Sequence, residues 1–184
     1  PVWLDAKKTS PFKFYQFWIN LPDTGIETYL KLYTFLTLEE IDSVMASHAK
    51  NPGAREAQQT LARLVTEIVH GPAAAAQAGA ATDALFGGRA FASLSREEVS
   101  VLLGEVPTLR MSKKTVVRPI VDVLVEGKTV PSKSEARRLI EASGVTLNGE
   151  VLSDPARELT LSDFTNELAI IRKGKRDVLL LKLT

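Results

Sequence analysis

The sequence predicts a chain of two parts: an all-helical region, then a small α+β unit in which two helices pack on a short antiparallel sheet. The first hundred residues repeat apolar side chains at helical spacing. After a break, two helical stretches precede segments rich in leucine and β-branched residues. The charge divides too, with 9 Lys/Arg and 12 Asp/Glu through Leu109 but 14 and 10 from Arg110 onward. We expect a helical domain over 1–110, a linker over 111–115 and an α+β domain over 116–184.

Composition excludes several classes of protein. The chain has 184 residues, 45% of them hydrophobic, which suffices for a core and is too much for disorder. It has no cysteine, which excludes disulfides and cysteine-ligated zinc. We expect no metal site, because His48 and His70 lie far apart, and both are interpreted as structural. No apolar run reaches the roughly 18 residues of a membrane span, and the N-terminus does not resemble a secretory signal. Because the chain starts without an initiator Met, we expect it to be part of something longer.

Six helices are expected in the first part. Ser10 is the predicted N-cap of the first, and Asp23 begins the second. Thr37 and Ser95 open capping boxes, and Gly71 ends the strongest helix. The expected ranges are 11–20, 23–34, 37–48, 52–70, 73–84 and 95–105, packed around Phe14, Trp18, Leu30, Leu61, Leu64 and Ile68. The aromatic residues Trp3, Phe14, Tyr15, Phe17 and Trp18 are interpreted either as core or as surfaces on which bases stack.

The second part has two predicted helices and two predicted hairpins. One helix runs from Pro119 to Gly127, and another runs over 133–143 behind a capping box at Ser132. Asn148-Gly149 suits a type I′ turn between two short strands. A second hairpin, "LAIIRKGKRDVLLLKL", turns near Gly174.

The helix over 133–143 is basic at its N-terminal half, through Lys133, Arg137 and Arg138. Cations there oppose the helix dipole slightly, so folding alone gives little reason for them, whereas a phosphate ligand gives one. The second hairpin adds Arg172, Lys173, Lys175 and Arg176 around its turn. The two clusters are predicted to border one RNA-binding groove. The alternative is a solvated basic face.

The stretch "SKSEARRLIEASGVTLNGEVL" resembles an RNA-binding domain shared by a ribosomal small-subunit protein, pseudouridine synthases and bacterial tyrosyl-tRNA synthetases. That domain shows a Ser-x-x-x-Ala-Arg-Arg-x-Ile helix followed by Gly-x-Val-x-Val-Asn-Gly. Leu147 stands where the second valine is usual. The resemblance implies that Lys133, Arg137 and Arg138, with Asn148 at the turn, contact structured RNA through its backbone.

The opening stretch "VWLDAKKTSPFKFYQFWINLPD" resembles the segment that follows the ATP-loop lysine motif in bacterial-type tyrosyl-tRNA synthetases. The resemblance implies an anticodon-binding helical domain followed by a domain that grips the long variable arm of tRNA(Tyr). The implied partners are tRNA(Tyr) and the enzyme's own catalytic domain, in a homodimer in the cytoplasm or an organellar matrix, with no membrane partner. It also implies that Asp23 lies near the anticodon, although an N-cap role explains this residue equally well.

No catalytic motif accompanies this resemblance. The sequence has no His-x-Gly-His and no glycine-rich phosphate loop, so ATP and tyrosine are expected to bind a catalytic domain outside this chain. "RMSKK" at 110–114 imitates a class I lysine loop but falls in the predicted linker, so we interpret it as a mobile linker or an additional tRNA contact. The function predicted is tRNA binding on behalf of the synthetase. The alternatives are a free-standing binder of another structured RNA, or a protein-interaction module.

Overall fold

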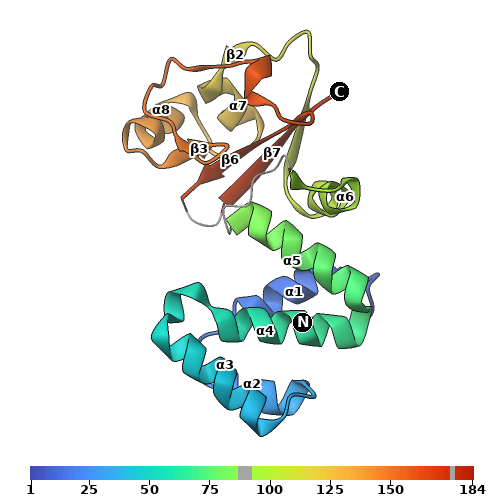
Figure 1. Ribbon diagram of the computed structural model, residues 1–184. Helices are drawn as coiled ribbons and strands as arrows, with labels where there is room; N and C mark the ends of the chain where they lie inside the picture. The colour runs from blue at the N-terminus through green and yellow to red at the C-terminus, as the bar shows by residue number, and fades with distance from the viewer. Residues whose placement is uncertain (87–92, 175–176) are drawn as a thin grey trace. The chain divides into compact units, whose positions relative to one another are not determined.

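The computed structural model describes residues 1–86, 93–174 and 177–184, and it divides into two compact units, Pro1–Thr82 and Asp83–Thr184 (Figure 1). The elements up to the division, which falls within α5, are α1 (Pro11–Ile19), α2 (Ile26–Tyr33), α3 (Leu38–Lys50), a 3-10 helix (Pro52–Ala54), α4 (Glu56–His70) and α5 (Pro72–Phe86). Those that follow are α6 (Arg96–Glu105), β1 (Thr108–Met111), β2 (Arg118–Pro119), α7 (Ile120–Glu126), α8 (Lys133–Glu141), β3 (Val145–Leu147), β4 (Glu150–Val151), β5 (Glu158–Leu159), a 3-10 helix (Leu161–Asp163), β6 (Leu168–Lys173) and β7 (Asp177–Leu183). The predicted fold class is confirmed.

The helical unit starts its helices largely where the sequence predicts. Ser10 caps α1, and Thr37 forms the complete capping box of α3. The predicted N-cap role of Asp23 is wrong, because Gly25, with φ at +84°, turns the chain directly into α2. That left-handed conformation suits glycine, so the helix begins three residues later than expected.

The core of the helical unit lies where α1, α2, α3 and α4 meet. Phe14, Leu30 and Leu61 are buried in it as predicted, and Trp18 packs against it while half-buried. Ile68, by contrast, is 49% exposed, so its assignment to the core is wrong. Ile68 shares the face of α4 that contains Leu61 and Val65, but it lies in the last turn of the helix, which ends at His70.

The second unit is built on a five-stranded sheet with the order β1-β7-β6-β3-β4. The β6–β7, β3–β6 and β3–β4 pairs are antiparallel, whereas β1 runs parallel to β7. The linker expected over 111–115 overlaps this sheet, because Met111 belongs to β1 and is buried in the core. Residues 112–115 continue as a turn in which the Thr115 amide donates to the Ser112 carbonyl. The segment read as a mobile linker is therefore partly an edge strand.

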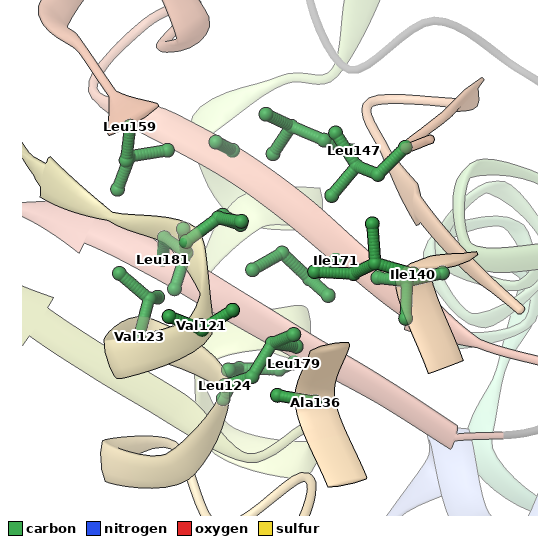
Figure 2. Close-up of a cluster of buried hydrophobic side chains, with 14 of the residues drawn as sticks. Val121, Val123, Leu124, Ala136, Ile140, Leu147, Leu159, Ile171, Leu179 and Leu181 are labelled. Atoms are coloured by element: carbon green, nitrogen blue, oxygen red, sulfur yellow. The ribbon is translucent and has the colours of Figure 1, made fainter. Parts of the chain in front are cut away.

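The core of the second unit lies between one face of the sheet and the helices α7 and α8 (Figure 2). Val123 and Leu124 of α7, and Ile140 of α8, point toward Leu181 and the other strand residues. This burial fixes which side of α8 faces outward.

Both predicted hairpins are present in the second unit. Asn148 and Gly149 have φ of 52° and 92°, the two positive values that a type I′ turn requires. Gly174, with φ of 61°, begins the turn between β6 and β7. Across the described residues, no helix is long and apolar enough to cross a membrane.

Candidate nucleic-acid interface

The basic side of α8 is fixed by the capping and burial of that helix. The Ser132 hydroxyl accepts a hydrogen bond from the Glu135 amide at 3.2 Å, which sets the helix start. Ala136 and Ile140 are fully buried against the sheet. Arg137 and Arg138, which follow Ala136 directly, are therefore directed to solvent and are exposed.

The three cations of α8 differ in what holds them. The Lys133 ammonium lies 2.8 Å from the Asp122 carboxylate of α7, and both side chains are partly exposed. Such a pair stabilises the fold by only about 0–1 kcal/mol, so an RNA phosphate competes with it easily. Arg137 and Arg138 have neither an ion pair nor a side-chain hydrogen bond within the described part of the chain. The two guanidinium groups are thus available for an anionic ligand.

The Asn148 side chain, predicted to contact RNA, is engaged within the protein at both ends. Its amide nitrogen donates to the Asp163 carbonyl at 2.6 Å, and its oxygen accepts from the Ile170 amide at 3.0 Å. These bonds tie the turn after β3 to β6 and to the short helix that ends at Asp163. The geometry gives this residue a structural role, which the sequence motif alone did not reveal.

The second basic cluster is described only in part, because Lys175 and Arg176 lie outside the described residues. Lys173 donates to the Thr129 carbonyl at 3.0 Å and lies 3.2 Å from the Asp177 carboxylate. Arg172 is half-buried, and that burial lowers the pKa of its guanidinium. The fold therefore brings the end of β6 beside the segment that precedes α8, but with Lys173 already bound to the protein.

Asp23 lies in the turn before α2, where buried polar groups hold it. Its carboxylate accepts from the Gln58 side-chain amide and lies 3.4 Å from His48 Nε2, while its side chain remains 57% exposed. The Arg55 guanidinium donates to the Ile19 and Leu21 carbonyls, at 2.7 and 2.8 Å, and fixes the same turn. Sequence reasoning missed Arg55 and Gln58. The available signal was a glutamine beside Ala57, in the mostly apolar stripe of α4.

The aromatic residues of the first unit divide between its core and its surface. Phe14 and Tyr15 are buried, so neither offers a face for stacking. Phe17 is 44% exposed, and Trp3 is 49% exposed beneath the Lys8 ammonium, which lies 4.5 Å from the ring centroid.

His48 is buried and His70 packs edge-on against Phe14, which fits the structural interpretation of both. Over the ranges that the structure describes, no group of three or more His, Asp or Glu residues has the arrangement of a metal site.

Two family models match successive parts of the chain. Residues 1–87 match the model described as tRNA synthetases class I (W and Y). Residues 98–181 match the model described as the tyrosine--tRNA ligase SYY-like C-terminal domain. The second match contains β1, α7, α8 and both hairpins, and thus the whole sheet of the second unit apart from the last residues of β7.

Relatives match nearly the whole chain. It is 44% identical over 182 residues to "Tyrosine--tRNA ligase 2" of Enterococcus faecalis, covering 98% of this chain and 43% of the relative. It is 41% identical over 186 residues to "Tyrosine--tRNA ligase" of Roseiflexus castenholzii, covering 99% and 44%. The chain thus spans less than half the length of these relatives. Among solved structures, a C-terminally truncated mitochondrial tyrosyl-tRNA synthetase of Aspergillus nidulans matches with a TM-score of 0.45 and 39% identity, over 46% of this chain and 23% of that one.

Proposed function

Because the chain belongs to the tyrosine--tRNA ligase family, whose C-terminal domain its second unit matches, we propose that it binds and positions tRNA(Tyr) for tyrosylation. The helical unit meets the anticodon stem, with Asp23 near the anticodon. The second unit grips the long variable arm. The observation that carries this proposal is the pair of exposed arginines on α8, inside the region that matches the C-terminal domain.

The contribution to catalysis is positional. Arg137 and Arg138 contact the phosphate backbone, which fixes the orientation of the tRNA without reading its sequence. A tRNA held in this way presents its acceptor end to a catalytic domain, and that orientation lowers the entropic part of the barrier. ATP and tyrosine bind the catalytic domain, which we propose also forms the homodimer. By itself the chain is expected to catalyse no tyrosine-dependent exchange of pyrophosphate into ATP.

The experiment is a binding titration of the chain with tRNA(Tyr) and with a second long-armed tRNA over a series of salt concentrations. Each phosphate contact contributes about 0.7–0.9 to the slope of log K against log salt. The slope is negative, and Arg137→Ala with Arg138→Ala should therefore reduce its magnitude by about 1.4–1.8. The matched control is Arg137→Lys with Arg138→Lys, which preserves both charges and should preserve the slope.

The outcomes separate the alternatives. Tighter binding of tRNA(Tyr), with a slope that depends on the two arginines, supports the proposal. Equal binding of both tRNAs indicates a general binder of structured RNA. A slope that the alanine pair leaves unchanged contradicts the role of α8.

A further inference from the structure

A second basic surface lies on the opposite face of the sheet from α8. Along β1 and β7, Leu109, Met111, Leu181 and Leu183 pack into the core beneath α7 and α8. Side chains alternate between the two faces of a sheet, so Arg110 and Lys182 point away from that core. Arg110 and Lys182 are also partners in the parallel β1–β7 register. Two cations are therefore held side by side on neighbouring strands, which are about 4.8 Å apart.

Folding gives no reason for this pair of charges. Like charges in adjacent cross-strand positions are destabilising. Within the described part of the chain, neither Arg110 nor Lys182 has an ion pair or a side-chain hydrogen bond. The nearby acidic residue Glu167 is bound to Lys113 at 2.7 Å, and that ion pair lowers the pKa of the Glu167 carboxyl. Lys182 also lowers the pKa of this carboxyl through its charge, but it acts more weakly than Lys113, whose ammonium is in direct contact.

The surface continues into a groove between α6 and the sheet. The groove has a volume of about 720 Å³. Its lining includes Val99 and Leu103 from α6, and Asn166, Glu167 and Lys182 from the sheet side. Arg96, at the start of α6, adds a further cation to its lining. The groove thus has a cation on each side, Arg96 from α6 and Lys182 from the sheet, next to the apolar side chains of Val99 and Leu103. Such a surface fits a nucleic-acid strand, whose phosphates contact cations and whose bases contact apolar groups.

We propose that this surface, made of Arg110, Lys182 and the groove between α6 and the sheet, is a second contact for the phosphate backbone of the bound RNA. The inference rests on the proposed function, because it takes the same RNA as its ligand. It extends the RNA footprint of the second unit from the α8 side to both faces of the sheet. The two surfaces contribute independently, because the core of the unit lies between them.

The test is a salt titration of RNA binding by the whole chain, with a tRNA(Tyr) transcript as the probe. Arg110→Ala with Lys182→Ala removes two cations and should reduce the magnitude of the slope of log K against log salt by about 1.4–1.8. The charge-preserving pair, Arg110→Lys with Lys182→Arg, should keep the wild-type slope. Circular dichroism melting of each variant checks that the sheet still forms.

A second experiment introduces Arg110→Ala with Lys182→Ala into the Arg137→Ala, Arg138→Ala variant. The magnitude of the slope should fall there by the same amount again. If the wild-type chain and the α8 variant differ as proposed but Arg110→Ala with Lys182→Ala changes nothing, the second surface is refuted and the proposed function stands. If the wild-type chain shows no salt-dependent RNA binding at all, both fail. If the charge-preserving pair loses as much as the alanine pair, the effect does not come from charge, which also refutes the inference.

Discussion

Gly127, the residue that ends α7, is held against the sheet so closely that it has no room for a side chain. A Cβ atom at this position would lie 2.2 Å from Leu179 Cδ2 and 3.1 Å from the Val123 carbonyl oxygen. The φ of Gly127 is −71°, so its backbone conformation suits any residue and only the space is restricted. Gly127→Ala thus tests the packing of α7 on β7 without adding backbone strain.

The expected cost follows from which atom has to move. The Leu179 methyl is the end of a side chain, but that side chain is only 3% exposed and belongs to the core cluster (Figure 2). The carbonyl of Val123 is fixed by its hydrogen bond from the Gly127 amide. Overpacking of this kind costs about 1–3 kcal/mol, and we expect about 1.5 kcal/mol for Gly127→Ala. In urea this corresponds to a midpoint lower by roughly 1 M.

The assay is urea unfolding followed by two probes. Trp3 and Trp18 both lie in the helical unit, so tryptophan fluorescence reports that unit, whereas far-UV circular dichroism reports both. Since each unit has its own core, Gly127→Ala should move the transition of the second unit and leave the fluorescence transition in place.

Two comparisons show whether the clash is the cause. Gly104→Ala in α6 is the matched control, because a Cβ there meets nothing within 4 Å, and it should be neutral or stabilising by up to about 1 kcal/mol. In a Leu179→Ala background, Gly127→Ala should cost much less. An unchanged or raised midpoint for Gly127→Ala would refute the reasoning.

Two further substitutions test local features. Asn148→Ala removes the bonds to the Asp163 carbonyl and the Ile170 amide and leaves alanine at φ +52°, so the free energy of unfolding should fall by about 2–4 kcal/mol. Asn148→Gly should cost less, and an equal loss in urea unfolding would contradict the strain component. Burial against Phe14 lowers the pKa of His70, so the folded state disfavours the protonated ring. Its contribution to stability is therefore complete above the ordinary histidine pKa and is lost as pH falls toward the folded value. Thermal unfolding between pH 7.5 and 5.5 should show a smaller pH dependence in His70→Gln, and an unchanged pH dependence would argue against this account.

Local patterns in the sequence determined the helix caps, the hairpin turn and the outward side of α8. Ser10, Thr37 and Ser132 cap helices because their hydroxyls bond to amides three residues away, so the information is contained in a few neighbouring residues. The type I′ turn at Asn148-Gly149 is equally local. The basic side of α8 follows from the apolar spacing of Ala136 and Ile140 alone.

The tertiary structure alone decided those features that depend on contacts between residues distant in the chain. From the sequence alone, Arg110 and Met111 are interpreted as linker residues, because their strand character comes from pairing with β7, some seventy residues later. That pairing alone places Arg110 beside Lys182. Asp23 read as a helix cap because its contact with Gln58 is invisible in the local sequence. Caps and turns are set by short-range hydrogen bonds, whereas edge strands and buried polar contacts form only when the chain closes long loops, and a sequence pattern does not record which distant residues then meet.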